Sequence, residues 1–108
     1  DFSSAIEDAF RRDGYTVTRL NAAGADFDLT KAGRVSLVGC KRWKVARAGV
    51  EPLRELEAAR QAREAHECIY VGAGEITDNA RAFAAEKNIR LLHGAELAKL
   101  FRSKIPRH

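Results

Sequence analysis

The sequence predicts an α/β protein with a three-layer α/β/α arrangement, in which a mixed sheet of five strands lies between helices. Apolar residues recur first at helical spacing, then in three strand-like runs, and afterwards helix and strand patterns alternate to the end of the chain. A strand–helix–strand connection places parallel strands side by side, so the later strands extend the sheet that the earlier antiparallel ones begin. The predicted order of elements is αβββαβαβα.

The chain opens with a predicted helix over residues 3–13, where apolar side chains recur every three or four positions until Gly14. Ser4, followed three residues later by Glu7, fits a capping box at the start of this helix. Residues 15–20 then carry the β-branched alternation of a strand.

A hairpin follows a predicted loop over residues 21–25. Its first strand covers residues 26–30, and its second, over residues 34–41, contains the longest apolar run in the chain. The pair Ala32-Gly33 forms the predicted turn between them.

The hairpin brings an acid and a lysine to one face of the sheet. With a two-residue turn, Asp28 lies opposite Leu37, and directly paired residues point to the same side. Because side chains alternate along a strand, Leu37 shares its face with Gly39 and Lys41. Asp28 and Lys41 are therefore expected on the same surface.

The second half of the chain has the alternation expected of parallel strands and covering helices. The predicted elements are a helix from Glu51, a buried strand over residues 68–74, a helix capped by Thr77, a strand over residues 88–93 and a closing helix after Gly94.

A length of 108 residues fits a single domain, predicted over residues 1–102, with a basic tail over residues 103–108. No apolar run approaches the roughly 20 residues of a membrane helix, so we expect no membrane contact within this chain. The first residue is Asp1, so we expect a domain cut from a longer protein. Cys40 and Cys68 lie in apolar strand-like runs, as buried thiols do in reduced proteins, and we expect a cytoplasmic location.

Positive charge is concentrated in the middle of the chain. The formal net charge is only +4, but no acidic residue occurs between Asp28 and Glu51. That interval predicts a basic patch suited to a polyanion such as a nucleic acid. Its basic residues are Lys31, Arg34, Lys41, Arg42, Lys44 and Arg47.

Six segments together resemble a known family. GYTV, GADFDL, LVGCKRWK, VEPLREL, IYVGAGEITDNARAFA and IRLLHGAELAKLF, in this order, resemble the Mrr-like branch of the restriction endonuclease superfamily, the PD-(D/E)xK nucleases. The resemblance covers essentially the whole chain, and the CKRWK block is its most specific part. It implies a restriction endonuclease-like fold and a Mg2+-dependent DNA endonuclease of the type IV restriction class, in which Mn2+ can replace Mg2+.

The resemblance also assigns roles to the hairpin residues. The family's metal-binding aspartate matches Asp28, and the lysine that positions water and stabilises charge at the phosphate matches Lys41. Two positions before that lysine the family has Glu, Asp or Gln, whereas this chain has Gly39. Asp28 and Lys41 are thus the predicted catalytic pair, with Gly39 as a departure from the motif.

Three interpretations of this departure are open. The missing ligand is replaced by a carboxylate from the following helix, with Glu55 or Glu51 as candidates. Alternatively, backbone and water complete the metal shell. In the third case the site is degenerate and the chain is a DNA-binding module. Glu7 resembles the family's auxiliary acid, although a capping role explains it equally well.

Around the site, Arg42, Lys44 and Arg47 are the predicted contacts with DNA phosphates, while Trp43 is expected to pack on the sheet edge. The partner is thus DNA, bound mainly through its backbone, and the resemblance leaves room for a homodimer. An interaction domain for a partner other than nucleic acid is the third functional hypothesis.

Overall fold

The computed structural model describes residues 2–41 and 43–102. The predicted tail over residues 103–108 lies outside the described residues. The elements are α1 (Phe2–Arg12), β1 (Thr16–Ala22), β2 (Ala25–Lys31), β3 (Arg34–Gly39), β4 (Arg47–Ala48), α2 (Glu51–Arg63), β5 (Glu67–Val71), β6 (Glu75–Ile76), α3 (Asp78–Lys87), β7 (Ile89–Leu92) and α4 (Ala95–Arg102).

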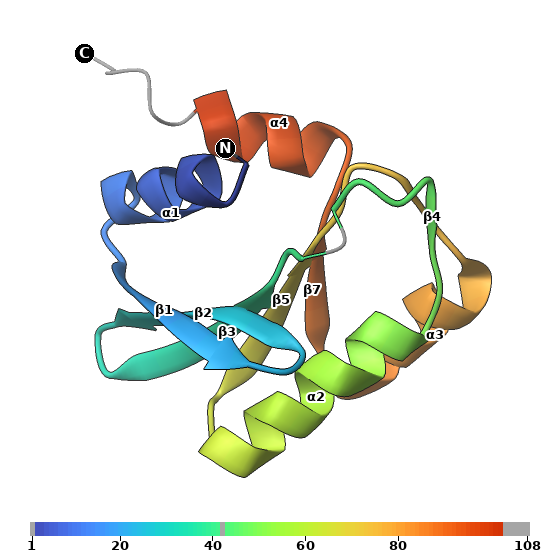
Figure 1. Ribbon diagram of the computed structural model, residues 1–108, viewed down its shortest axis with the longest axis horizontal. Coiled ribbons are helices and arrows are strands. Elements are labelled where there is room, and N and C mark those ends of the chain that lie inside the picture. The colour runs from blue at the N-terminus through green and yellow to red at the C-terminus, as the bar shows by residue number, and fades with distance from the viewer. Residues whose placement is uncertain (1, 42, 103–108) are drawn as a thin grey trace.

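The main sheet has the mixed five-stranded arrangement that the sequence predicts. Its strand order is β1-β2-β3-β5-β7. The pairs β1–β2 and β2–β3 are antiparallel, whereas β3–β5 and β5–β7 are parallel. Helices α1 and α4 cover one face of the sheet and α2 lies against the other, giving three layers (Figure 1).

The alternation of side chains along β2 and β3 divides the core between the two faces. Phe27 on β2 packs with Ile6 and Phe10 of α1, whereas Leu37 on β3 packs with Leu56 of α2. All five side chains are at most 2% exposed. Side chains alternate along β2, so Asp26 and Asp28, the neighbours of Phe27, lie on the face of the sheet that meets α2.

Two predictions about the first part of the chain are wrong in detail. Helix α1 begins at Phe2, so Ser4 lies inside the helix and does not cap it. The loop expected over residues 21–25 is a tight turn, because β1 continues to Ala22 and β2 starts at Ala25. A register shift between Arg19 and Ala22 marks a bulge in β1, which a seven-residue pattern of alternation does not reveal.

A second, two-stranded sheet pairs β4 with β6 in parallel and was not predicted. It ties the chain that follows β3 to the chain that follows β5. The N–H of Ala73 donates to Trp43 O at 3.0 Å and that of Glu75 to Ala46 O at 2.9 Å. A Cβ atom at Gly74 would lie 2.2 Å from Val45 O, so this approach requires a glycine. The basic segment after β3 is thus held by backbone contacts.

No helix in residues 2–41 and 43–102 is both long enough and apolar enough to cross a bilayer. Both cysteines are free and buried, as predicted. Burial raises the pKa of the Cys40 thiol to about 11, with Asp26 adding to the shift, and raises the pKa of Cys68 to about 12.

These shifts predict a loss of stability in alkali. An unfolded thiol releases its proton near pH 9 but a folded Cys68 holds it until about pH 12, so the thiol favours unfolding increasingly across that window. The free energy of unfolding of Cys68→Ala should fall less steeply with pH than that of the wild type, by up to about 1.4 kcal/mol per pH unit. Denaturant titrations between pH 8 and 11 measure both slopes. Identical slopes would contradict the prediction.

Candidate active site

A cavity of about 180 Å³ opens where β3 and β5 end, between the β1–β2 turn and the start of α2. Ligands of sheets with parallel strands bind at this carboxyl end, where the chain turns away from the sheet. The lining residues come from both halves of the chain: Ala23, Gly24, Asp26, Gly39, Lys41, Pro52, Glu55 and Tyr70. This cavity is the candidate active site.

Asp26 is the acid that the hairpin brings into the cavity. Its Oδ2 accepts a hydrogen bond from the backbone N–H of Cys40 at 2.7 Å, and its Oδ1 lies 3.9 Å from Lys41 Nζ. A charged acceptor makes such a bond short and strong, so the carboxylate is firmly oriented. Lys41 remains 70% exposed, and at this distance its ammonium is free to turn toward a ligand.

Asp28 keeps the predicted register but does not reach the cavity. It pairs with Leu37, as expected, and Phe27 pairs with Val38. The next step of the same register places Asp26 across from Gly39, and Asp28 lies two residues, or roughly 7 Å, farther down the strand. Thr30 Oγ1 donates to Asp28 Oδ1 at 3.3 Å. The structure thus brings Asp26, and not Asp28, to Lys41.

The sequence contained the signal for Asp26. The two-residue turn that sets Asp28 opposite Leu37 equally sets Asp26 opposite Gly39, the position where the family motif has a ligand. The family resemblance assigns the metal-binding aspartate to Asp28, whereas the pairing across the hairpin places Asp26, and not Asp28, opposite Gly39.

Gly39 sits in a tight position on the buried side of the cavity. A Cβ atom there would lie 3.2 Å from Gly24 O and 3.5 Å from Leu56 Cδ1. Gly24 is closer still to α2, since its added Cβ would lie 2.5 Å from Glu55 O. The two glycines allow the hairpin to rest directly on the helix that provides Glu55.

The three other candidate acids differ in their positions. Glu55 lines the cavity, while Glu51 is exposed in the first turn of α2 and is absent from the lining. Glu7 is buried on α1 and forms ion pairs with Arg11 at 2.6 Å and Arg19 at 2.7 Å. Helix α1 covers the opposite face of the sheet, so Glu7 lies away from the residues that line the cavity (Figure 1).

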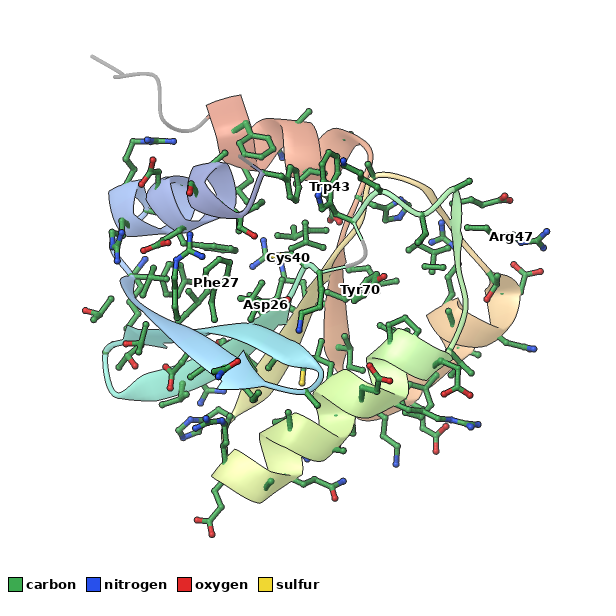
Figure 2. All side chains as sticks on the ribbon, in the orientation of Figure 1. Asp26, Phe27, Cys40, Trp43, Arg47 and Tyr70 are labelled. Carbon is green, nitrogen blue, oxygen red and sulfur yellow. The ribbon has the colours of Figure 1, made fainter. Side chains whose placement is uncertain are left out.

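The basic residues that follow β3 do not form one continuous track. Lys44 is exposed, and its Nζ lies 5.8 Å from the centre of the Trp43 ring. Trp43 stacks on Phe2 of α1 with the ring centroids 3.9 Å apart, so it packs against a helix and not on the sheet edge as predicted. Arg47 points outward on the far side of β4 from Asp26 and Tyr70 (Figure 2). Arg42 lies outside the described residues.

Lys31 and Arg34 belong to another part of the surface. They pair with each other beside the β2–β3 turn, at the opposite end of the strands from Lys41. The Lys31 ammonium donates to Asp13 O at 2.9 Å and lies 4.8 Å from the centre of the Tyr15 ring. The acid-free interval of the sequence is therefore divided between two sites in the fold.

The cavity offers two carboxylates, from Asp26 and Glu55, to a cation. Within residues 2–41 and 43–102 there is no group of three His, Cys, Asp or Glu side chains that could hold a metal ion. Mg2+ is commonly held by one or two carboxylates, with waters and substrate phosphates as its remaining ligands. The donor set fits a Mg2+ ion of this kind and not a site that is complete within the protein.

The Mrr_cat family model, described as a restriction endonuclease, matches residues 1–101. The chain belongs to this family. Its predicted restriction endonuclease-like fold is confirmed by the strand order and by the solved structures that resemble it. No curated protein matches the chain.

Three solved structures share this restriction endonuclease-like fold at low sequence identity. A crystal structure of the protein of unknown function AF1548 has a TM-score of 0.75 at 12% identity, over 94% of this chain and 65% of that one. A repair endonuclease from Pyrococcus abyssi has a TM-score of 0.61 at 16% identity, over 83% of this chain and 43% of that one. The MspJI restriction endonuclease, in complex with a 27-mer oligonucleotide, has a TM-score of 0.60 at 16% identity, over 94% of this chain and 26% of that one. The chain thus spans less than two thirds of each of these proteins.

The contact between the hairpin and α2 predicts unequal effects of two glycine substitutions. Gly24 and Gly33 both have positive φ, of 84° and 81°, so alanine strains the backbone at either position. Only Gly24 faces α2, because an added Cβ at Gly33 meets nothing within 4 Å. Gly24→Ala should lower the free energy of unfolding by about 1–3 kcal/mol more than Gly33→Ala. Denaturant titration measures both, and equal losses would show that the contact with Glu55 is not restrictive.

Proposed function

We propose that this chain is a Mg2+-dependent DNA endonuclease domain of the Mrr-like restriction type, and that Asp26, Glu55 and Lys41 form its hydrolytic site. The observation that carries the proposal is the convergence of these three side chains on one cavity at the carboxyl end of the central strands. Membership of the restriction endonuclease family supports it. The oligonucleotide in the MspJI structure supports DNA as the substrate.

Each of the three side chains has a task that its position suits. Asp26, oriented by the Cys40 N–H, and Glu55 would hold the ion from two sides of the cavity. When bound, Mg2+ supplies Lewis-acid polarisation of a phosphate oxygen and a more acidic water. The exposed Lys41 ammonium donates to a non-bridging phosphate oxygen and stabilises the negative charge that builds up there.

The reaction is a hydrolysis with no redox step. A water oxygen forms a bond to phosphorus, the bond from phosphorus to one ester oxygen breaks, and the water protons pass to solvent and to the leaving oxygen. A cavity of about 180 Å³ has room for several waters beside a phosphate group. Lys41, which lines the cavity, is 70% exposed and so is accessible to a DNA backbone at the surface.

A DNA-binding module without cleavage is the second candidate function. Position 39 offers no side chain, and the described residues contribute two carboxylates, those of Asp26 and Glu55, to the cavity lining. A protein with this fold could keep Lys41 and Lys44 for phosphate contacts after losing hydrolysis, since such contacts position a duplex without chemistry. Measuring binding and cleavage on the same DNA separates the two functions.

The nuclease proposal predicts that Asp26 and Asp28 differ in importance. Asp26→Asn and Lys41→Ala should each slow metal-dependent nicking of plasmid DNA by roughly a hundredfold or more, because each removes a charge that acts on the reacting phosphate. Asp28→Asn, a matched change on the same strand face, should stay within about threefold of the wild type.

Gel assays with Mg2+ and with Mn2+ measure these rates. Wild-type protein that leaves the plasmid intact with both ions would refute hydrolysis. A severe loss in Asp28→Asn, with Asp26→Asn unaffected, would return the catalytic role to Asp28, the residue that the family resemblance assigns.

DNA affinity should depend on Lys44, which follows β3, and not on Lys31 beside the β2–β3 turn. Lys44→Gln should weaken binding to a short duplex and reduce the dependence of log K on log salt by about 1, the value for one phosphate contact. Lys31→Gln removes the same charge at the other end of β2 and should leave that slope unchanged. Fluorescence anisotropy at several salt concentrations measures both variants, and equal slopes would mean that DNA does not follow the segment after β3.

A further inference from the structure

We propose that Trp43 is a positioning residue for Lys41, and that its stack on Phe2 fixes the turn from which the lysine reaches the cavity. The inference rests on the proposed nuclease function, in which Lys41 acts on the phosphate. It makes α1, which covers the other face of the sheet, part of the support of the site (Figure 1).

The contacts of the Lys41 side chain are too weak to hold it in one place. Its ammonium lies 3.9 Å from Asp26 Oδ1, and the side chain is exposed. An exposed ion pair at this distance contributes little, because water and salt screen both charges. Strand β3 ends at Gly39, so the main sheet does not hold the backbone of Lys41 either. The position of the lysine therefore depends on the turn that contains it.

That turn is fixed at both ends by backbone N–H and C=O groups. At its start, the Cys40 N–H donates to Asp26 Oδ2 at 2.7 Å. The Trp43 N–H donates to Cys40 O at 3.2 Å, which closes the turn around Lys41. At its end, Trp43 O accepts from the Ala73 N–H at 3.0 Å. Trp43 takes part in two of these three bonds, so whatever holds Trp43 also holds the lysine.

The ring of Trp43 is anchored on the helices of the other face. It stacks on Phe2 of α1, with the ring planes 13° apart and the centroids at 3.9 Å. Phe2 meets Phe101 of α4 edge to face, with centroids at 5.9 Å, and both pack against the core on that side. Such aromatic pairs add to the stabilisation that burial alone provides. In Figure 2, Trp43 lies toward α1 and α4, Asp26 toward the hairpin, and Cys40 between them.

Trp43 is the one partly buried side chain that the structure describes in this basic segment. The other described residues from Lys41 to Arg47 have exposed side chains, apart from the start of β4 at Arg47 without regular structure. Surface hydrogen bonds compete with water and add little net stability, so the stack is the contact that withdraws the segment from solvent. A displacement of about 1 Å at a reacting group can cost roughly a hundredfold in rate, so this restraint affects the reaction.

Backbone dynamics test the proposal without requiring cleavage. In the wild type, the amide of Lys41 should have a 15N order parameter near about 0.85, the value of rigid backbone. Phe2→Leu removes the stack and should lower this order parameter toward about 0.6, the value of flexible backbone. The matched variant Phe101→Leu removes the edge-to-face contact, leaves the stack and should keep the Lys41 amide rigid. A mobile Lys41 amide in the wild type, or equal order parameters in all three proteins, would overturn the proposal.

The effect on the reaction is tested at saturating DNA. Phe2→Leu and Trp43→Leu should each slow nicking by roughly tenfold to a hundredfold. Their affinity for DNA should stay within about threefold of the wild type, because the lost restraint acts on the chemical step. Trp43→Phe keeps a ring to stack on Phe2 and should restore nicking, and Phe101→Leu should nick at the wild-type rate. A loss of DNA affinity with the rate at saturation unchanged would mean that Trp43 contacts DNA directly, which would overturn the positioning role.

Folding of the variants is established independently. Trp43 is the only tryptophan of the chain, so Phe2→Leu should shift the fluorescence emission to longer wavelength as the indole meets water, while thermal melts report the fold. If Phe2→Leu does not fold, the comparison of Trp43→Phe with Trp43→Leu and the wild-type order parameter decide the proposal.

The outcomes also separate this inference from the function on which it rests. Wild-type nicking that Asp26→Asn abolishes and Phe2→Leu leaves intact would overturn the role of Trp43 and keep the nuclease. Absence of nicking in the wild type would refute the nuclease. In that case a loss of order at Lys41 in Phe2→Leu, and not in Phe101→Leu, would still support the stack as the restraint on the lysine, and its absence would overturn both.

Discussion

The hydrogen bond from the Cys40 N–H to the Asp26 carboxylate is the contact on which the site depends. Strand β3 ends at Gly39, so the amide of Cys40 is the first one past the paired residues. At 2.7 Å a charged acceptor on the neighbouring strand satisfies this amide. The same bond orients Asp26 and determines where the chain leaves the sheet with Lys41. One interaction therefore helps to place both Asp26 and Lys41 at the cavity.

The fold determines which basic residues of the middle segment lie close to the cavity. In the sequence, six basic residues share one acid-free interval, which suggests a single surface. In the fold, the β2–β3 turn holds Lys31 and Arg34 at one end of the strands, while Lys41 and Lys44 lie at the other. The mini-sheet of β4 and β6 then turns Arg47 away from the cavity. A phosphate backbone at the site would meet the cations that immediately follow β3.

The fold was largely predictable because its signals are local. Periodic apolar positions gave the helices and main-sheet strands, and Ala32-Gly33 gave a turn and hence a register that the structure confirms. The paired strands β4 and β6 were not predicted, because each has two residues and so is too short to show an alternation of apolar and polar side chains. Pairing between side chains on α2 is also not readable from apolar spacing: Glu57 is 7% exposed, and Arg60 binds its carboxylate through two nitrogens at 3.0 and 2.7 Å.

The site was less predictable, for a different reason. The side chains of Asp26 and Asp28 both lie on the face of the sheet that α2 covers. They are two residues apart on β2, so either could be matched to the family's aspartate. Only the pairing across the hairpin, together with the bulge in β1 beside Asp26, distinguishes them. Tyr70 was read as part of a buried apolar strand, because nothing local to it indicates that its neighbour on the adjacent strand is a glycine.

Gly39 is best understood as part of the packing and not as a simple loss. Gly24 rests on the backbone of α2, and Gly39 lies beneath it, with Leu56 filling the space next to its Cα. A larger residue at position 39 would have to displace the β1–β2 turn or the helix by a few tenths of an ångström at least. The same close contact brings Glu55 into the cavity lining and leaves little room for a side chain at position 39. The absent motif residue and the carboxylate from α2 are therefore two consequences of one close contact, which explains how a family member can lack that residue and still gather acids and a lysine around the same cavity.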